Sequence, residues 1–346
     1  MANSMDRFPS KEYELIRRIQ KILPPVDLAQ TCYEEAIGGD AAIRVSKAAG
    51  ERLVITADVS VENVHFSQST MTLEEAGCRA MASNLSDCAA MGAFPDSALV
   101  QLVFPSDCVD VTSSIENIYA GFARACEQWK FPIVGGDLSR GAVWTLGITL
   151  IGAIPAGGRA LKRTGIVDGD ALWVTGTPGG SAAGLAALKR WGRWDAPPRC
   201  EKFIDAHVAP TPRIGEGAAL AACPDIHAMM DLSDGLSKDV GTLCFDNNLG
   251  FIFESGLKPS SETMNLAKEL DCDWENWFYH GGEEYELLFA CAPSFDPTGV
   301  IKPVDNKTAK NLLKLGHFTS KFHEMRIPHK DNTTEVLQPS GWDHIT

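Results

Sequence analysis

The stretch TLEEAGCRAMASNLSDCAAMG, residues 72–92, predicts a helix of small residues between two apolar segments. Thr72 and Glu75 stand three residues apart, which is the spacing of a capping box at the start of a helix. The apolar segment 52–61 precedes this helix, and the apolar segment 97–104, which Pro105 closes, follows it. Both segments are predicted to be strands. This strand–helix–strand order is typical of the α/β class.

Further strands and helices extend the same order over most of the chain. In the first half we expect a helix beginning at Lys11, a helix over 112–129, and strands over 131–137 and 143–154. A Pro/Gly cluster at 155–158 precedes a second series. That series has strands over 171–176, 226–232 and 250–255, a strand after Gly282, and helices over 181–191, 200–222, 237–245 and 261–270. We therefore expect an α/β (α+β) protein of two domains, residues 1–156 and 157–346, with a polar, loop-rich chain from about residue 292.

The composition argues against several classes of protein. Its 346 residues carry 31 Lys and Arg against 45 Asp and Glu, a net charge of −14, which disfavours nucleic-acid binding. Glycine and proline interrupt the longest apolar stretches well before the ~20 residues of a membrane helix. Residues 1–18 lack the apolar core of a secretion signal, and the 10 cysteines form no CxxC pair. We therefore expect a cytoplasmic protein with reduced cysteines that binds neither nucleic acid nor membrane.

Aspartates recur where apolar segments end. A single aspartate beside Gly or Ser is usual in a turn. A set of them at one edge of a sheet is instead how α/β folds gather ligand-binding groups. Carboxylate oxygens are the ligands that Mg²⁺ prefers, and phosphate bound with Mg²⁺ relieves the repulsion among them. A magnesium and phosphate site is thus predicted at six aspartates: Asp40, Asp58, Asp87, Asp137, Asp231 and Asp234.

The common nucleotide-binding motifs are absent from the sequence. It contains no P-loop, no H-R-D or D-F-G of protein kinases, and no clean G-x-G-x-x-G after a strand. The glycine-rich turn TGTPGGSAAG, residues 175–184, fits an anion-binding turn or a tight packing turn between a strand and a helix. Both interpretations stay open.

Eight motifs resemble, in order and spacing, those of the thiamine-monophosphate kinase family: NLSDCAAMGA, GGD followed by SR, GRALKRTG, GTPGGSAAGL, PTPRIGEG, DLSDGLSKD, GGEEYEL and GWDH. The resemblance runs from about Glu12 to His344, and the superfamily includes aminoimidazole ribonucleotide synthetase. It implies an N-terminal sheet domain that pairs with its twin into a barrel-like homodimer core, and a C-terminal mixed-sheet α/β domain. It also implies that thiamine monophosphate is phosphorylated by ATP to thiamine diphosphate, in a cleft between the domains.

The resemblance further implies a role for each matching residue. Several Mg²⁺ ions would be held by Asp40, Thr56, Ala57, Asp58, Asp87, Asp137, Asp231 and Asp234, of which Asp87, Asp137 and Asp231 would be catalytic. ATP would contact Gly136, Asp137, Arg163 and Ser233, and the thiamine side would contact His65, Glu283 and Trp342. Three positions depart from the family pattern: Gly39 replaces an acidic residue, Ala57 replaces Thr or Ser, and Glu284 replaces Asp.

The chemistry of this reaction agrees with such a residue set. The attacking phosphate oxygen is largely ionised near pH 7 because its second pKa is about 6, so no strong general base is required. The sequence indeed shows no evident Ser/His/Asp or Cys/His arrangement. The main barrier is the repulsion between two polyanions, which Mg²⁺ and an in-line geometry reduce.

Alternatives stay open for single residues and for the whole chain. Glu283 and Glu284 could lie in a solvated turn before a strand, and His65 could be a capped loop residue. The chain could also be another enzyme of the superfamily, with a different phosphoryl acceptor, or a non-catalytic dimeric scaffold. The GGEEYEL motif and Trp342 count against a different acceptor, and the presence of Asp87, Asp137 and Asp231 counts against a scaffold, so an active kinase is favoured.

Overall fold

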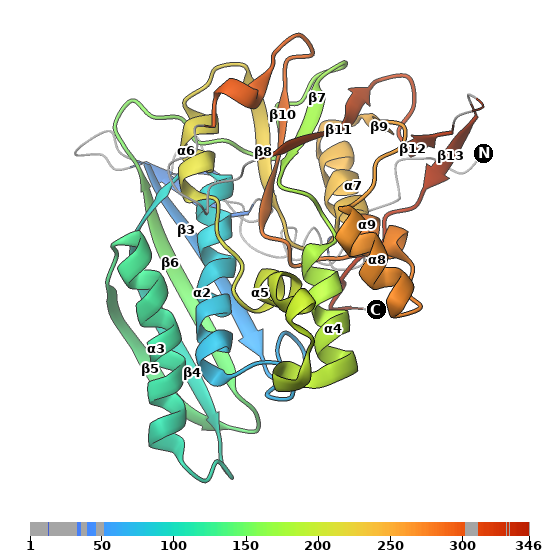
Figure 1. The fold of residues 1–346 in the computed structure, drawn as a ribbon. Helices are drawn as coiled ribbons and strands as arrows, with labels where there is room; N and C mark the ends of the chain where they lie inside the picture. The colour runs from blue at the N-terminus through green and yellow to red at the C-terminus, as the bar shows by residue number, and fades with distance from the viewer. Residues whose placement is uncertain are drawn as a thin grey trace.

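The computed structural model describes residues 13, 33–35, 40–45, 52–301, 311–329, 331 and 333–345. These residues form two mixed β-sheets with helices packed against them (Figure 1). The first sheet has the strand order β1-β2-β3-β6-β4-β5. Its elements are β1 (Tyr33–Glu35), β2 (Ala42–Val45), β3 (Arg52–Val61), α2 (Leu73–Ala90), β4 (Phe94–Pro105), α3 (Val111–Trp129), β5 (Ile133–Gly141) and β6 (Thr145–Ile154).

Helix α2 links the two sheets, and its first turn is capped as the sequence predicts. The N–H of Glu75 donates to the Thr72 hydroxyl at 3.1 Å, and the N–H of Thr72 donates to the Glu75 carboxylate at 2.8 Å. Small residues let α3 approach closely, since a Cβ on Gly77 would lie 2.3 Å from the carbonyl oxygen of Ile118. The helix contacts β3 and β6 of the first sheet and β8 and β10 of the second.

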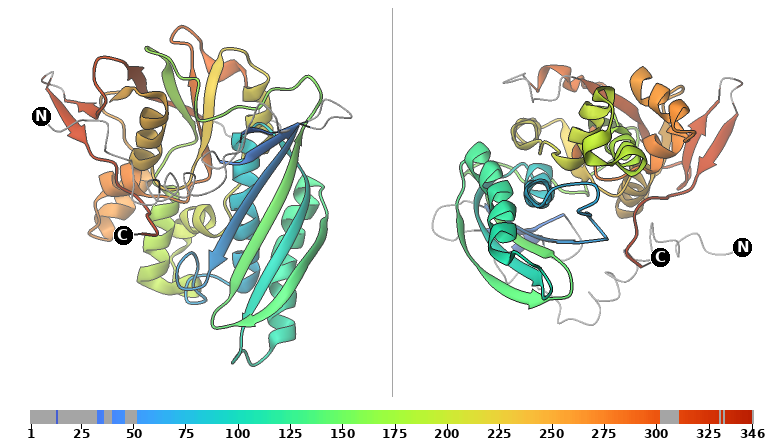
Figure 2. Two further views of the ribbon diagram at one scale, coloured as in Figure 1. Left: turned by 180° about the vertical axis from the view of Figure 1, so that it is seen from behind. Right: turned by 60° about the horizontal axis from the view of Figure 1, so that its bottom comes forward.

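Only one face of the first sheet is covered by helices in the part of the chain that the structure describes (Figure 2). Along β6, every second residue from Leu146 to Ile154 is buried, and the residues between them are half-buried. The buried set faces α2 and α3 and forms part of a core that includes Phe122. At the edge of the sheet, β5 is exposed from Val134 to Arg140.

The second sheet has the strand order β13-β12-β9-β11-β7-β10-β8, and its strands β7, β10 and β8 are buried on both faces. Neighbouring residues of β8 enter two different cores: Met229 packs with the side chains of α2, and Met230 packs with those of α7. The elements of this half are β7 (Ala171–Thr175), α4 (Gly180–Asp195), α5 (Glu201–Val208), α6 (Ile214–Ala221), β8 (Ile226–Leu232), α7 (Leu236–Asn247), β9 (Gly250–Phe253), α8 (Ser261–Glu269), α9 (Trp274–His280), β10 (Glu286–Cys291), β11 (Leu312–Thr319), β12 (Met325–Pro328) and β13 (Thr334–Leu337).

The predicted fold class is confirmed, with corrections to single elements. The strands expected over 52–61 and 226–232 are β3 and β8. The expectation of a loop-rich chain after 292 is wrong, because β11 lies within the second sheet between β9 and β7. The strand expected over 131–137 runs on to Gly141, so Asp137 lies inside β5 and not at its end.

Two predictions concern residues outside the described part of the chain. Apart from Tyr13, which is helical, the helix predicted from Lys11 lies outside the described residues, and so does the departure at Gly39. The division into residues 1–156 and 157–346 and the barrel-like dimer core stay predictions. Among the described helices, none combines the length and the apolar character needed to cross a membrane.

Candidate active site

A cleft of about 1340 Å³ lies where the two sheets and α2 meet. Its wall is formed by the end of β3 with the loop after it, by α2, by the start of α4, by the loops after β8 and before β10, and by the chain at 340–344. The sequence-predicted residues that line it are Ala57, Asp58, His65, Asp87, Asp231, Ser233, Asp234, Glu283 and Trp342.

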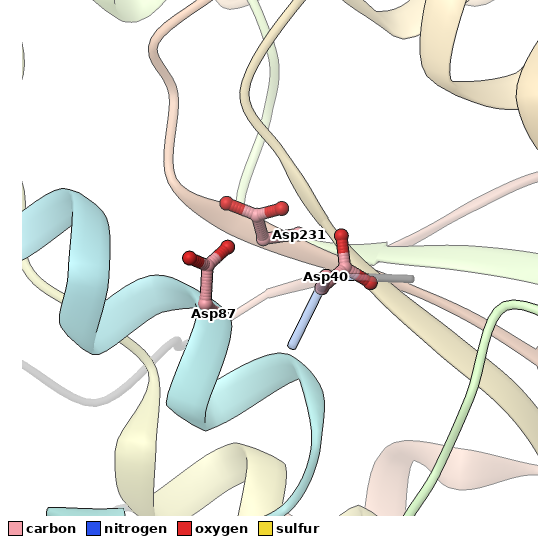
Figure 3. Close-up of side chains that lie close together, drawn as sticks. All are labelled: Asp40, Asp87 and Asp231. Atoms are coloured by element: carbon pink, nitrogen blue, oxygen red, sulfur yellow. The ribbon is translucent and has the colours of Figure 1, made fainter. Parts of the chain in front are cut away.

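Three aspartates from separate segments converge at one end of this cleft. Asp40 precedes β2, Asp87 lies in the last turn of α2, and Asp231 is the penultimate residue of β8. One carboxylate oxygen of each lies within 4.8 Å of the other two (Figure 3). Such an arrangement of hard oxygen ligands suits a divalent cation.

Side chains from neighbouring elements orient these carboxylates. The hydroxyl of Thr56, a buried residue of β3, donates to Asp87. The hydroxyl of Ser86 donates to Oδ2 of Asp231 at 2.9 Å, and Nε of Arg163 donates to Oδ1 of Asp40 at 2.9 Å. Because each partner comes from another part of the fold, the carboxylates are held in place before any ligand binds.

The electrostatics of the cluster favour a bound cation. Burial, with the nearby carboxylate of Asp40, raises the pKa of Asp231 to about 8. Burial and the carboxylates of Asp58, Asp231 and Asp40 raise the pKa of Asp87 well above its usual range. Among the described residues, Oδ2 of Asp40 is buried and has no hydrogen-bond partner. A buried carboxylate oxygen without a donor is costly, and a metal ion would satisfy it.

Two further aspartates border the cluster. The backbone N–H of Asp58 donates to the side-chain oxygen of Asn84 at 3.2 Å, which joins β3 to α2. Burial, followed by the carboxylates of Asp234 and Asp40, raises the pKa of Asp58. Asp234 pairs with Lys238 at 2.8 Å. Asp58 and Asp234 therefore add to the negative field of the cluster.

Gly136 and Asp137 lie apart from the other predicted site residues. In the first sheet Asp137 is aligned with Gln101, Gln101 with Gly147, and Gly147 with Val59. Three strand spacings of about 4.8 Å therefore separate Asp137 from β3. A Cβ on Gly136 would lie 1.9 Å from the carbonyl oxygen of Val100, so glycine is also required here for packing.

Three of the motifs quoted from the sequence meet at the loop after β8. The buried carboxylate of Asp239 accepts the N–H groups of Ser233, Asp234 and Gly235 at 3.1 to 3.3 Å. Two carbonyl oxygens of the same loop also accept hydrogen bonds. The carbonyl of Ser233 accepts the N–H of Glu283 at 2.7 Å, and the carbonyl of Asp234 accepts the N–H of Trp342 at 3.0 Å. The loop thus connects the carboxylate cluster to the residues expected on the thiamine side.

The wall of the cleft that is expected to bind thiamine carries aromatic rings. The imidazole of His65 lies 5.0 Å from that of His344 and 6.5 Å from the Trp342 ring, measured between ring centroids. Nδ1 of His65 accepts the N–H of Val61 at 3.1 Å, which fixes the ring. His65 and Trp342 therefore share one wall, and His344 joins them.

Neither Glu283 nor Glu284 of the GGEEYEL motif lies in a solvated turn. Glu283 accepts a hydrogen bond from the guanidinium of Arg79, which projects from α2. Glu284 accepts the N–H groups of Gly179 and Ser181 at 2.9 and 3.0 Å, at the start of α4. The glycine-rich turn of residues 175–184 therefore binds a carboxylate of this same chain. Burial raises the pKa of Glu284 to about 8, although both N–H groups act in the opposite direction.

Sequence reasoning missed several residues that line the cleft or hydrogen-bond to a residue lining it. Arg79, Ser86 and His344 lie within quoted stretches of the sequence but were given no role, and His207 lies in α5. The one available signal was Arg79, a charged residue in a helix segment otherwise made of small and apolar residues. The others are brought to the cleft only by the tertiary fold.

Comparison with known proteins places the chain in a family. Two family models match it: AIR synthase related protein, N-terminal domain, over residues 38–154, and AIR synthase related protein, C-terminal domain, over residues 167–315. A thiamine-monophosphate kinase of Synechococcus elongatus is 36% identical over 323 residues, covering 91% of this chain and 93% of that protein. A thiamine-monophosphate kinase of Bacillus subtilis is 30% identical over 337 residues, covering 96% and 99%.

Solved structures agree with these relatives. AaThiL complexed with AMPPCP and TMP matches with a TM-score of 0.79 and 29% identity, over 96% of both chains. The thiamine monophosphate kinase of Aquifex aeolicus matches with a TM-score of 0.75 and 28% identity, over 93% of this chain and 97% of that one. The resemblance found in the sequence is confirmed, and the chain belongs to the thiamine-monophosphate kinase family of AIR synthase-related proteins.

Proposed function

We propose that this protein transfers the γ-phosphoryl group of ATP to thiamine monophosphate, giving thiamine diphosphate and ADP. Its relatives over nearly the whole chain are named thiamine-monophosphate kinases, and a related structure binds AMPPCP and TMP. The observation that carries the proposal is the cluster of Asp40, Asp87 and Asp231 at one end of a cleft whose other wall holds aromatic and acidic side chains.

Magnesium fits the carboxylate cluster. Its donors are hard oxygens, and Oδ2 of Asp40 is buried with no partner among the described residues. Mg²⁺ would neutralise phosphate charge during the transfer. The residues proposed to hold several such ions are Asp40, Thr56, Ala57, Asp58, Asp87, Asp137, Asp231 and Asp234, with Thr56 acting here through its hydrogen bond to Asp87.

The protein's share of the chemistry is positioning. The phosphate of the acceptor is already a nucleophile near pH 7, so no side chain needs to remove a proton from it. Direct in-line transfer requires the two phosphates to be held end to end, with their charge compensated. In this proposal Gly136, Arg163 and Ser233 contact ATP, and Asp87, Asp137 and Asp231 are the catalytic aspartates through the ions that they hold.

The opposite wall would bind the thiamine group. Trp342 is half exposed toward the cleft, and its ring can stack on a thiazolium cation. Glu283 supplies a negative charge to the same cation, and His65 stands beside Trp342. Thiamine monophosphate would therefore meet the carboxylate cluster at one end of the cleft and the aromatic side chains at the other.

We further propose that the protein acts as a homodimer. Asp137 lies on an edge strand of the described sheet, three strand spacings of about 4.8 Å from β3 of its own chain. The same strand exposes Val134 and Leu138, at 61% and 54%, and long exposed apolar edge strands are usually paired with another chain. A second copy packed on this sheet would bury them and could bring its Asp137 to the neighbouring cleft.

Mixing two inactive variants tests the dimer. In a mixture of Asp87→Ala and Asp137→Ala chains, each mixed dimer would contain one intact site if Asp137 serves the partner's cleft. We expect kinase activity to return on mixing, and light scattering to give the mass of two chains. A monomer by light scattering, or no recovery of activity from chains shown to exchange, contradicts the proposal.

We also propose a cytoplasmic location, where ATP and a reducing environment suit the free thiols.

The reaction itself is tested with purified protein, ATP, Mg²⁺ and thiamine monophosphate. Thiamine diphosphate is detected by fluorescence after its oxidation to a thiochrome. We expect product that disappears with EDTA and in the Asp87→Ala variant. Mg²⁺-dependent ATP binding without product would show that the acceptor is a different phosphate compound, and the proposal would be wrong.

A further inference from the structure

A buried arginine in the cleft has no role in the reaction described above. Arg79 projects from the middle of α2, is only 4% exposed, and lines the cleft. Its Nη2 donates to Oε1 of Glu283, and its Nη1 donates to the carbonyl oxygen of His207 at 3.0 Å. Burying a guanidinium is unfavourable unless such partners compensate its charge. Here the partners come from segments that lie 128 and 204 residues further along the chain.

The backbone at Glu283 requires support of this kind. Glu283 and Tyr285 have φ angles of +66° and +52°, a region that residues other than glycine rarely adopt. Such a conformation persists only where surrounding contacts hold it. The N–H of Glu283 donates to the carbonyl oxygen of Ser233 at 2.7 Å, and Arg79 holds the side chain. Together these two contacts determine where the carboxylate points.

His207 fixes the arginine from the other side. Nη1 of Arg79 lies 2.9 Å from ring Nε2 and 3.3 Å from ring Nδ1, and because a guanidinium can only donate, we assign the nearer nitrogen, Nε2, as the acceptor. Burial, together with the positive charge of Arg79, keeps the pKa of His207 well below its ordinary value, so the ring is neutral near pH 7. Its proton is then on Nδ1, which lies 3.1 Å from the hydroxyl of Ser181 in α4. The chain Ser181–His207–Arg79–Glu283 thus connects three helices to the cleft.

One oxygen of Glu283 is left for a ligand. Arg79 bonds to Oε1, whereas Oε2 lies 3.9 Å from His207, beyond hydrogen-bond distance. The Glu283 side chain is 30% exposed and lines the cleft. A cationic group that enters the cleft can therefore approach Oε2 without displacing Arg79.

We infer that Arg79 is a positioning residue for the acceptor: it fixes the Glu283 carboxylate in the cleft wall so that the free oxygen meets the thiazolium cation. This inference rests on the proposed function. Two other roles are physically reasonable for the same side chain. Arg79 could bind the acceptor phosphate directly, or it could only cancel the charge of Glu283. The three roles predict different affinities for thiamine, which carries the cation without a phosphate.

The test measures the binding of thiamine, thiamine monophosphate and AMPPCP by calorimetry, with Mg²⁺ present. We expect Arg79→Gln to bind thiamine and thiamine monophosphate roughly 10- to 100-fold more weakly, as for the loss of an oriented charged hydrogen bond. Binding of AMPPCP should not change. Arg79→Lys should retain more affinity than Arg79→Gln, because a lysine can reach Glu283 but cannot bridge it to His207.

Two further variants separate positioning from general damage. In Arg79→Gln/Glu283→Gln the acceptor should bind no more weakly than in Glu283→Gln alone, because Arg79 acts through that carboxylate. Arg193→Gln is the matched control: Arg193 of α4 bonds to Glu75 of α2, the helix that carries Arg79, at 2.6 and 2.9 Å, but does not line the cleft. Its acceptor affinity should equal that of the wild type.

Each other outcome overturns the inference. Weaker binding of thiamine monophosphate alone would mean that Arg79 binds phosphate, and tighter binding of thiamine would mean that it only cancels charge. Unchanged affinities, or an equal loss for AMPPCP, would leave Arg79 with a structural role. If the wild type binds neither thiamine compound, the proposed function fails as well, which distinguishes that result from all the others.

Discussion

The two ends of the cleft are built by different means. At the carboxylate end, Asp87 and Asp231 belong to a regular helix and a regular strand, and hydroxyl groups of neighbouring residues orient them. At the other end, the loop end that we propose binds thiamine, Glu283 and Trp342 lie in irregular segments, and Glu283 has a left-handed backbone. Sites on helices and strands are held more rigidly than sites on loops. The difference suggests that the carboxylate end determines the chemistry and the loop end determines which acceptor is used.

Removing Asp87 should give the largest effect and should act on turnover. We expect Asp87→Ala to lower kcat/KM by at least about 1000-fold, since metal-assisted charge stabilisation is worth several kcal/mol and 1.36 kcal/mol is tenfold. Thiamine binding should change little. Asp96→Ala, at an exposed aspartate of β4, is the control. Near-normal turnover in Asp87→Ala would remove the proposed distinction between the two ends.

The carboxylate end could be predicted from sequence further than the loop end. Aspartates after apolar segments indicated a metal site, and Asp40, Asp87 and Asp231 do converge. The place of Asp137 could not be predicted, because it depends on the strand order, in which β6 lies between β3 and β4. The contact between Arg79 and Glu283 could not be predicted either, since it joins residues 204 positions apart in the sequence.

The fold shows the same limit. Local patterns predicted β3 and β8 with their full bounds, because periodicity and turn residues act over short distances. They did not predict β11, which mixes polar and apolar residues, as in LLKLGHFT. This segment is a strand because β7 and β9 pair with it on both sides. Tertiary pairing can override weak local preference in this way.

Without a bound metal ion, the protein should become less stable as the pH rises, because the carboxylates of the cluster then ionise. Burial and Asp40 raise the pKa of Asp231 to about 8, whereas an aspartate in an unfolded chain has a pKa of about 3.9. The folded state therefore binds this proton more tightly than the unfolded state. In EDTA the free energy of unfolding should fall as pH rises from about 4 to about 8, and stay constant above that.

Thermal melting checks this pH dependence. We expect the Tm in EDTA to fall by on the order of 5 °C across that range. Saturating Mg²⁺ should reduce the slope because it binds the ionised carboxylates. Asp231→Asn should also flatten the curve. Identical slopes with and without Mg²⁺ would mean that the clustered carboxylates do not share a cation.

Shortening Trp342 should affect the loop end alone. Cation–π contacts are worth about 0.5–2 kcal/mol, so Trp342→Ala should bind thiamine monophosphate roughly 2- to 30-fold more weakly. Trp342→Phe should retain part of the affinity, and binding of AMPPCP should stay the same. Calorimetry measures all three values. If both ligands are lost together, the segment at 340–344 serves the whole cleft, and the proposed division between its ends is wrong.

The smallest effect should come from a hydroxyl that only orients a carboxylate. Ser86 is fully buried and donates to Oδ2 of Asp231 at 2.9 Å. Without this donor the ionised carboxylate loses about 1 kcal/mol of stabilisation, so Ser86→Ala should weaken Mg²⁺ binding roughly fivefold. Thr263→Ala, which removes a buried hydroxyl from α8 outside the cleft, should not. If Ser86→Ala instead matches Asp87→Ala in activity, the donors are as important as the carboxylates, and the rigidity of this end depends on its whole hydrogen-bond network.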